Sequence, residues 1–264
     1  MRGRALTVGG SDSGGGAGVQ ADLKTFNALS VFGSSAIVAI TAQNSVEVSG
    51  IMPVPVRFVE KQIEAVLVDI GTDAVKTGML YSAEIIEAVA HKLKKYDVRN
   101  VVVDPVMVAK TGARLLRKNA VETLMTGLLP ISLLATPNIP EAEIMADMKI
   151  TSEEDMRSAA RKINETTGAN VLVKGGHGAG SRSTDVFFSG SGYRSFSGER
   201  IKTRNTHGTG DTLSAAITAY LARGRNIEDA VSAGREFLQS AVEHSFPVGR
   251  GFGSLDHSWR LNDD

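Results

Sequence analysis

Short apolar runs rich in β-branched residues alternate along this chain with longer amphipathic segments, and this alternation restricts the possible folds more than any other feature. Apolar runs of a few residues predict strands, whereas apolar residues at helical spacing predict helices. The expected strands cover residues 5–8, 35–41, 74–76, 100–104, 133–136 and 170–173. The expected helices cover residues 19–29, 56–69, 83–96, 117–128, 142–146, 153–166, 209–223 and 227–245.

Strands that are separated by helices imply right-handed crossover connections, which place the strands parallel to one another. We therefore expect an α/β fold of three α/β/α layers, with a mainly parallel central sheet and helices on both faces. Residues 184–189 and 192–196 predict a hairpin across Gly190 and Ser191. The length of 264 residues fits one large domain or two small ones. We expect a single domain over residues 1–264, because no linker or repeat divides the chain.

Composition excludes several classes of function. The chain has no cysteine, which excludes disulfides, thiolate zinc sites and a cysteine nucleophile. Its formal net charge is zero, so no global field favours nucleic acid or an anionic membrane. No apolar run reaches the length of a membrane span, and the N-terminus lacks the pattern of a signal peptide. We therefore expect a cytoplasmic protein with no nucleic-acid or membrane partner.

The strongest chemical pattern lies within residues 205–215, at the start of an expected helix. Gly208, Thr209 and Gly210 are small, so their backbone N–H groups can converge on an anion at the positive end of the helix dipole. Asp211 follows at once, where it could take a proton from an alcohol that attacks a phosphate. The alternative is that Asp211 only caps the helix, and a short motif does not decide between the two.

A second glycine-rich stretch covers residues 9–18, directly after the first expected strand. Six glycines in ten residues let a ligand approach the backbone closely, and they are costly in chain entropy, which favours a function over a merely flexible turn. The stretch is neither a P-loop nor a dinucleotide fingerprint, because it lacks both spacings. Asp22 comes four residues after Gly18, and on local grounds it is interpreted as a favourable charge near a helix N-terminus.

Polar residues follow several other expected strands, at the edge of the sheet where ligands of open parallel sheets bind. Gln43 offers a paired donor and acceptor that suit the edge of a heterocycle, although a surface turn explains it equally well. Asp104, Asn138 and Glu141 could position Mg²⁺ directly or through waters. Helix capping is a strong alternative for Asn138 and Glu141.

A lysine closes the last expected parallel strand. Lys174 precedes two glycines and could neutralise nucleotide phosphate, or it could be a solvated charge on a loop. His177 and His207 lie near these motifs, but neither has a partnered serine or acid at a convincing spacing, so no catalytic role is expected for them.

Taken together, these residues resemble the ribokinase-like superfamily and, within its vitamin-kinase branch, the hydroxymethylpyrimidine/phosphomethylpyrimidine kinases of thiamin biosynthesis. The ordered motifs that carry the resemblance are residues 9–18, 21–26, 41–44, 76–80, 103–107, 136–142, 174–177, 205–214 and 248–251. The resemblance implies a ribokinase-like fold and phosphorylation of 4-amino-5-hydroxymethyl-2-methylpyrimidine and of its monophosphate. It also implies ATP and Mg²⁺ as cofactors, small-molecule partners only, and a homodimer.

The resemblance implies a role for each matching position. The pyrimidine pocket is expected at Asp22, Gln43 and Met79, with backbone near Gly10 and Val106. The nucleotide side is expected at Lys174 and Gly176, and the magnesium-organising acids at Asp104 and Glu141. Gly208, Thr209 and Gly210 are expected to form the anion hole, with Asp211 as the catalytic base.

One position departs from the pattern of the thiamin-pathway kinases. They commonly have cysteine where this chain has Asp211, whereas ribokinase and pyridoxal kinase have aspartate there. Pyridoxal kinase therefore stays an alternative, since pyridoxal also carries a hydroxymethyl group on an aromatic nitrogen ring. A non-catalytic pyrimidine sensor and a sugar kinase are further alternatives. The intact anion hole argues against the sensor, and Gln43 with Met79 suits a flat ring better than a polyol.

Overall fold

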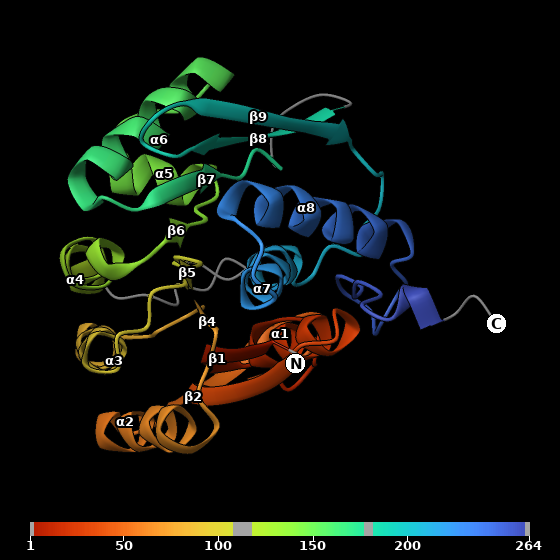
Figure 1. Cartoon of the computed structure of the whole chain (residues 1–264). Coiled ribbons are helices and arrows are strands. Elements are labelled where there is room, and N and C mark those ends of the chain that lie inside the picture. The colour runs from red at the N-terminus through yellow and green to blue at the C-terminus, as the bar shows by residue number, and fades with distance from the viewer. Residues whose placement is uncertain (1–2, 108–117, 177–181, 262–264) are drawn as a thin grey trace.

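The computed structural model describes residues 3–107, 118–176 and 182–261. Its strands form a nine-stranded sheet in the order β3-β2-β1-β4-β5-β6-β7-β8-β9 (Figure 1). The strands from β2 to β7 in this order are parallel, while β3 at one edge and β8 and β9 at the other are antiparallel to their neighbours. The sequence-based prediction of a mainly parallel sheet is therefore confirmed.

The strands of the described residues are β1 (Arg4–Ser11), β2 (Phe32–Gln43), β3 (Val48–Pro53), β4 (Ala74–Thr77), β5 (Val101–Val103), β6 (Leu134–Ala135), β7 (Asn170–Val173), β8 (Arg182–Phe188) and β9 (Tyr193–Glu199). The α-helices are α1 (Gly18–Ala28), α2 (Val56–Ala65), α3 (Ala83–Lys95), α4 (Lys118–Thr123), α5 (Ile139–Ala146), α6 (Glu153–Thr167), α7 (Thr209–Ala222) and α8 (Ile227–Glu243). Short π-helical turns extend α2 over Val66–Ile70 and α4 over Leu124–Leu128.

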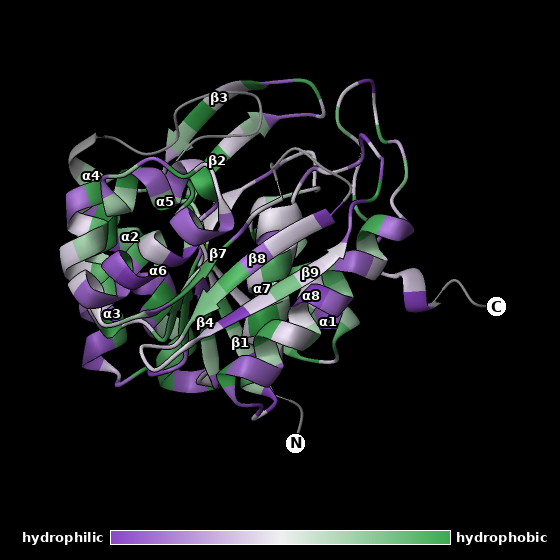
Figure 2. Ribbon diagram, turned by 90° about the horizontal axis from the view of Figure 1, so that it is seen from above, coloured by the Kyte–Doolittle hydropathy of each residue, from purple (hydrophilic) through white to green (hydrophobic). Residues whose placement is uncertain are grey.

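Helices cover both faces of the sheet, as predicted. Helices α2 to α6 lie on one face and α1, α7 and α8 on the other, with the sheet between them in Figure 1. A separate apolar cluster lies on each face. In Figure 2 the hydrophobic colour is concentrated along the central strands between the two helical layers. Of the helices described, none combines the length and apolar character that a bilayer crossing requires.

Alternation along the strands assigns each side chain to one of the two faces. Val101 and Val103 pack in the cluster under α2 to α6, whereas Val102 packs in the cluster under α1, α7 and α8. Four polar residues continue the alternation of the second cluster. Thr7 and Lys76 lie within β1 and β4, and Asp104 and Lys174 directly follow β5 and β7. The strand period therefore brings these polar groups to the face where α1 and α7 begin.

Several boundaries differ from the predictions for physical reasons. Strand β7 has the predicted bounds, but β3 was not predicted, because none of its residues is buried and they lack an apolar alternation. Helix α5 begins at Ile139 rather than at residue 142, because Asn138 caps it and Pro140 fits the first helical turn. The hairpin of β8 and β9 is confirmed, with strands longer than predicted. Residue 117, where one helix was expected to begin, lies outside the described residues.

Candidate active site

The polar motifs predicted from the sequence meet at one edge of the sheet. Strands β1, β2, β4, β5, β6 and β7 all run to this edge, and the next residues in the chain are the glycine-rich loop, Met79, Asp104, Asn138 and Lys174. Gln43 is the last residue of β2. The amino ends of α1 and α7 reach the same edge, so backbone N–H groups and their dipoles face these side chains.

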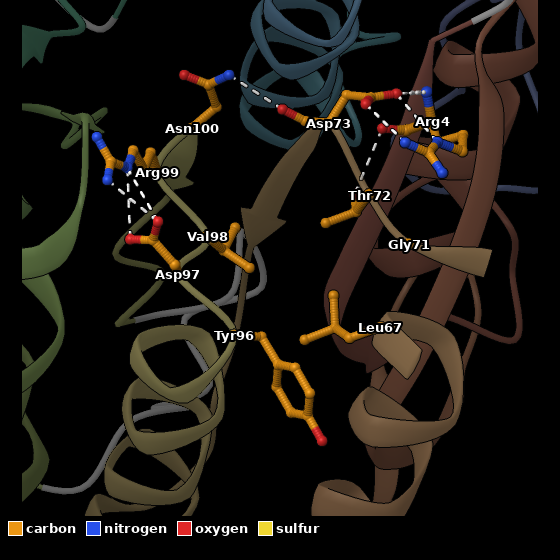
Figure 3. A pocket seen from close by; sticks show the side chains of 10 residues that line it. All are labelled: Arg4, Leu67, Gly71, Thr72, Asp73, Tyr96, Asp97, Val98, Arg99 and Asn100. Atoms are coloured by element: carbon orange, nitrogen blue, oxygen red, sulfur yellow. Dashed lines mark hydrogen bonds and ion pairs between the residues drawn. The ribbon is translucent and has the colours of Figure 1, made fainter. Parts of the chain in front are cut away.

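A cavity of about 340 Å³ lies at the opposite edge, where the strands begin (Figure 3). Its charged groups neutralise one another: Arg4 pairs with Asp73 at 2.9 Å and Arg99 with Asp97 at 3.1 Å. The side chain of Asn100 donates to the carbonyl oxygen of Asp73 at 3.0 Å. Because these groups already have partners, the cavity is a weaker candidate for chemistry than the carboxyl edge.

The predicted anion-binding nest lies where α7 begins. Gly208 caps the helix with a φ of 82°, which glycine adopts without strain, and a Cβ at this position would overlap the carbonyl oxygen of Gly16. Thr212 donates the first helical hydrogen bond, to the carbonyl oxygen of Gly208 at 2.9 Å. The N–H groups of Thr209, Gly210 and Asp211 therefore have no acceptor within the helix and are available to an anion.

The glycine-rich loop is held against this nest by Asp12. The carboxylate accepts hydrogen bonds from the N–H groups of Gly14 at 2.8 Å and Ala17 at 2.9 Å, and it contacts Nε2 of His207 at 2.8 Å. Burial opposes ionisation of Asp12, but His207 and the backbone donors outweigh it and hold the pKa of Asp12 below its usual range. His207 thus joins two loops, and Asp12 is an acidic partner that the spacing in the sequence did not reveal.

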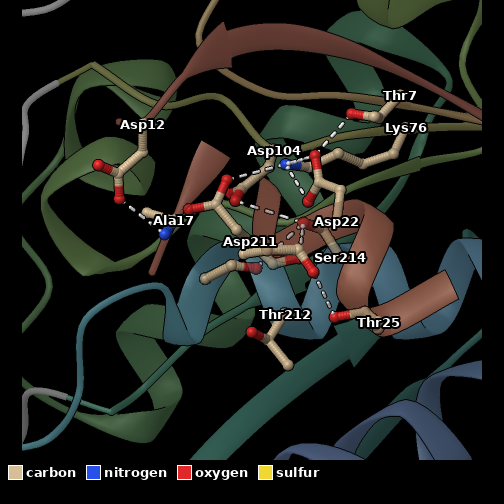
Figure 4. A network of polar contacts seen from close by, with 12 residues as sticks. Thr7, Asp12, Ala17, Asp22, Thr25, Lys76, Asp104, Asp211, Thr212 and Ser214 are labelled. Carbon is tan, nitrogen blue, oxygen red and sulfur yellow. Dashed lines mark hydrogen bonds and ion pairs between the residues drawn. The ribbon is translucent and has the colours of Figure 1, made fainter. Parts of the chain in front are cut away.

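The carboxylate of Asp211 is bound to a buried lysine. Nζ of Lys76 lies 2.9 Å from Oδ1 of Asp211 and 2.9 Å from each carboxylate oxygen of Asp22 (Figure 4). The side chains of Lys76 and Asp22 are 1% exposed, and that of Asp211 is 18% exposed. Thr7 donates a further hydrogen bond to Asp22 at 2.5 Å. Lys76 on β4 therefore links helices α1 and α7 to the sheet through the carboxylates of Asp22 and Asp211.

Burial and the charges in this network shift the pKa values of Asp22 and Asp211 in opposite directions. Burial and the charge of Asp211 raise the pKa of Asp22 to about 7, although Lys76 and Thr7 oppose the shift. Burial also opposes ionisation of Asp211, but Lys76, the N–H of Gly18 and Lys174 together lower its pKa. Lys76 loses hydration on burial, yet the acids around it raise its pKa, so it stays an ammonium. Asp211 is thus ionised at neutral pH and partly open to solvent.

A second network of charged groups lies on the other side of the nest. Lys174 donates to Oδ1 of Asp104 at 2.8 Å, and Thr136 and Ser214 contact the same carboxylate at 3.3 and 3.4 Å. A Cβ built on Gly210 would lie 3.3 Å from Nζ of Lys174 and 3.4 Å from Oδ2 of Asp104. The lysine is therefore a partnered group at the nest and not a solvated charge on a loop.

Glu141 caps α5, which is one of the two interpretations that the sequence left open. Its carboxylate accepts from the N–H of Asn138 at 2.9 Å, which completes a capping box at the start of α5. Its other oxygen accepts from the N–H of Met107 at 3.4 Å. Burial and the charge of Asp104 raise the pKa of Glu141 to about 7, although Lys174 opposes the shift, so Glu141 belongs to the same charged network.

The donor set of Asp104 and Glu141 fits a hydrated magnesium ion. Within the described ranges no three His, Cys or acidic side chains are grouped as a closed metal site. Two buried carboxyl groups instead face the ammonium of Lys174, so the acids outnumber the base. Mg²⁺ commonly uses one or two carboxylates together with waters and substrate phosphates, so this incomplete set suits it.

The residues predicted for a flat ring lie beside the glycine-rich loop. A Cβ built on Gly10 would lie 2.5 Å from Cε of Met79, so the methionine methyl group covers the backbone there. Ser13 exchanges hydrogen bonds with the backbone of Gln43 at 2.7 and 2.8 Å, which places Gln43 against the loop that holds His207. The backbone N–H of Val106 is bound to the carbonyl oxygen of Asp104 at 2.8 Å.

The structure differs from one sequence-based expectation and shows one buried charge that was not predicted. Asp22 was expected in the ring pocket, but its carboxylate is buried behind Lys76 and presents no surface to a ligand. Lys76 was not predicted as a site residue. A lysine at the end of a short strand that is otherwise apolar, in a sheet covered on both faces, is the signal that could have identified it. His177 lies outside the described residues.

Several known proteins are similar to this chain along most of its length. A family model described as phosphomethylpyrimidine kinase matches residues 12–256. The chain is 50% identical over 256 residues to the thiamine biosynthesis bifunctional protein ThiED of Geobacter sulfurreducens, a match that covers 97% of this chain but only 52% of that protein. The chain thus spans about half the length of this relative.

Two further relatives match along nearly their whole length. The hydroxymethylpyrimidine/phosphomethylpyrimidine kinase of Bacillus subtilis is 47% identical over 255 residues, covering 96% of this chain and 94% of that protein. The structure of the pyridoxal kinase from Staphylococcus aureus in complex with AMP-PCP and pyridoxal superposes with a TM-score of 0.92 at 34% identity, covering 100% and 96% of the two chains. The ribokinase-like fold expected from the sequence is thereby confirmed.

The raised pKa of Asp22 predicts a pH-dependent contribution to stability. The folded protein holds this proton up to about pH 7, whereas the unfolded chain loses it at lower pH, so stability from this group is lost as the pH rises through 7. Asp22→Asn removes the effect. Compared with the variant, the wild type should lose free energy of unfolding between pH 5 and 8, by at most about 1.4 kcal/mol per pH unit.

Urea denaturation of both proteins across this range measures the difference. Burial raises the pKa of Glu141 to about 7 and lowers that of His257 to about 4. Both residues are present in both proteins, so their contributions to the pH dependence of stability cancel in the comparison. Parallel stability curves for the wild type and Asp22→Asn would show that Asp22 does not titrate in this range.

Proposed function

The chain belongs to the phosphomethylpyrimidine kinase family, and from this membership we propose that it transfers the γ-phosphate of ATP to the hydroxymethyl oxygen of 4-amino-5-hydroxymethyl-2-methylpyrimidine. A second transfer, to the resulting monophosphate, gives the diphosphate. One observation in particular supports the assignment. The Asp211 carboxylate stands in the first turn of α7, beside N–H groups that have no acceptor within the helix. An acid is unfavourable at an anion site unless it has a task, and accepting a proton from an alcohol is such a task.

In this mechanism Asp211 accepts the hydroxyl proton while the alcohol oxygen bonds to the γ-phosphorus. The bond from that phosphorus to the bridging oxygen of ADP breaks, and ADP leaves. The N–H groups of Thr209, Gly210 and Asp211 donate hydrogen bonds to the phosphoryl oxygens during the transfer. These donors are fixed by the helix before the substrate arrives, so they stabilise the transition state without reorganising.

The nucleotide phosphates are placed between the nest and Lys174. Lys174 and the backbone at Gly176 bind the phosphates, where the lysine charge offsets theirs. Asp104 and Glu141 hold a hydrated Mg²⁺, which neutralises phosphate charge when it is bound. The contact distances at Gly210 support this placement, because they put Lys174 and Asp104 directly beside the nest.

The substrate ring occupies the neighbouring slot. Gln43 forms hydrogen bonds to the ring edge, while Met79 and the backbone at Gly10 and Val106 pack on its faces. The contacts of Met79 with Gly10, and of Gln43 with the glycine-rich loop, support this arrangement. Asp22 acts from behind Lys76 and does not touch the ring, because its side chain is buried.

Removing the proton acceptor tests the mechanism directly. Asp211→Asn keeps the size of the side chain but cannot take the proton, so kcat should fall by roughly 10²–10⁴-fold. Binding of ATP, measured by titration calorimetry, should persist because the N–H groups and Lys174 remain. Glu236→Gln, on the exposed part of α8, is the matched control and should leave kcat unchanged. Wild-type turnover by Asp211→Asn would remove Asp211 from the mechanism.

Pyridoxal is the second candidate substrate, favoured by the close superposition on the pyridoxal kinase that was crystallised with AMP-PCP and pyridoxal. Asp211 in place of the cysteine common among thiamin-pathway kinases also leaves room for it. We expect kcat/KM for the hydroxymethylpyrimidine to exceed that for pyridoxal, measured by ADP release under the same conditions. A large preference for pyridoxal would reverse the assignment of the substrate and leave the phosphotransfer chemistry intact.

A homodimer is proposed at the edge of the sheet formed by β3. Ile40 and Met52 face each other across β2 and β3, and they are 45% and 61% exposed. Phe58 on α2 is also exposed. An open edge strand with apolar neighbours is a surface that proteins usually cover. Met52→Glu should therefore shift the mass measured by light scattering towards the monomer. Ile144→Glu, on α5, should not, and a monomeric wild type would contradict the proposal.

A further inference from the structure

Lys76 is a fully buried ammonium between acids from two different helices. It contacts Asp22 on α1 and Asp211 on α7 through three ion contacts, each 2.9 Å long. Lysine is rarely buried without a partner, and an unpaired charge at this depth would strongly destabilise the fold. One partner would satisfy that requirement. The presence of a second acid, the partly exposed Asp211, therefore needs an explanation of its own.

We propose that Lys76 is a positioning residue of the phosphotransfer site: its ammonium fixes the Asp211 carboxylate through Oδ1 and leaves the exposed part of that carboxylate for the substrate hydroxyl. This inference rests on the proposed function, in which Asp211 accepts the proton. An ionised carboxylate has about four acceptor positions, so the contacts of Asp211 with Lys76 and with the N–H of Gly18 do not exhaust it. A fixed carboxylate presents its free oxygen in one direction, and misplacement of about 1 Å at such a group can reduce the rate roughly 10²-fold.

Asp22 complements this role from the buried side. Its two oxygens hold Nζ of Lys76, and Thr7 holds Asp22 in turn, so the ammonium cannot rotate away from Asp211 (Figure 4). Asp22 also takes a share of the lysine charge. With Asp22 ionised, the three groups together carry one excess negative charge, so Asp211 keeps more basicity than it would in a simple ion pair.

The backbone is shaped to admit this contact. A Cβ built on Gly78 would lie 2.9 Å from Nζ of Lys76 and 3.8 Å from Oδ1 of Asp211. A side chain at this position would therefore crowd the ammonium. Lys174, the other cation near Asp211, is held by Asp104 at 2.8 Å. Lys76 is thus the lysine for which the described structure gives a direct contact with Asp211.

The pH profile separates positioning from mere structural support. The groups that face Asp211 are Lys76 on β4, Asp22 and the N–H of Gly18 on α1, Lys174 and Asp104 at strand ends, and His257 near the C-terminus. In Lys76→Met the ammonium is lost, and burial then raises the pKa of Asp211. Since Asp211 must be deprotonated to act, the acid limb of kcat/KM should move to higher pH.

The first measurement is steady-state kinetics of Lys76→Met. We expect kcat to fall by about 10²-fold, with KM for ATP changed by less than about threefold because Lys174 and the nest are intact. Asp22→Asn keeps an acceptor for Lys76 and is the matched comparison. It should show a smaller loss of kcat and an acid limb that does not move to higher pH, because the lysine charge still reaches Asp211.

Chemical rescue is unusually clean in this chain, because it contains no cysteine. In Lys76→Cys, unfolded in urea, the thiolate displaces bromide from 2-bromoethylamine and forms a thioether that ends in an ammonium at the lysine position. After refolding, this protein should recover at least about tenfold in kcat over the same variant alkylated with 1-iodopropane. Wild type carried through the same treatment controls for side reactions and for refolding.

The outcomes distinguish a failure of the proposed mechanism at Asp211 from a failure of the positioning role of Lys76. If Asp211→Asn keeps wild-type turnover, the proposed mechanism fails before Lys76 is considered. If Asp211→Asn is inactive while Lys76→Met keeps wild-type kcat and acid limb, the positioning role is overturned and the proposed function stands. The positioning role is also overturned if Lys76→Met loses the same fraction of kcat/KM at every pH and if the two alkylating agents restore kcat of Lys76→Cys equally. If Lys76→Met does not fold, Asp22→Asn/Lys76→Met removes both buried charges and is subjected to the same measurements.

Discussion

The burial of one ammonium group, that of Lys76, constrains the rest of this structure. A charge with 1% exposure must be neutralised by groups that are themselves held in place. Its partners come from α1 and α7, so the ion contacts fix both helices relative to β4 in the centre of the sheet. The first turn of α7, with its free N–H groups, is thereby positioned over the ends of the strands.

A second lysine held by an acidic side chain lies on the other side of α7. Lys174 is held by Asp104, with Glu141 close by, and Ser214 of α7 contacts Asp104 as well. Gly210 lies beside this second network, where a Cβ would lie 3.3 Å from Nζ of Lys174. Each network contains more acid than base, and the helix N-terminus supplies the positive end of a dipole. This combination suits a phosphate that arrives together with a divalent cation.

Much of this arrangement could be predicted from the sequence because it depends on local patterns. Apolar runs and helical spacing predicted every parallel strand, and the rule that ligands bind at carboxyl ends grouped Gln43, Asp104 and Lys174 correctly at one edge. Strand β3 was missed because an exposed edge strand need not be apolar. Glu141 was left between capping and metal binding, and the structure gives it the capping contacts together with a position in the charged network.

The sequence by itself determined the layers of the fold, the polar groups at the strand ends and the glycines that allow a nest at Gly208, because these follow from periodicities of two and 3.6 residues and from the conformational range of glycine. Only the tertiary structure decided the partners of the charges. Asp22 faces Lys76 and not a ligand because the rotation of α1 about its axis is set by packing against the sheet. Contacts that span 54 and 135 residues, such as those of Lys76 with Asp22 and Asp211, depend on how distant elements pack, which no local pattern specifies.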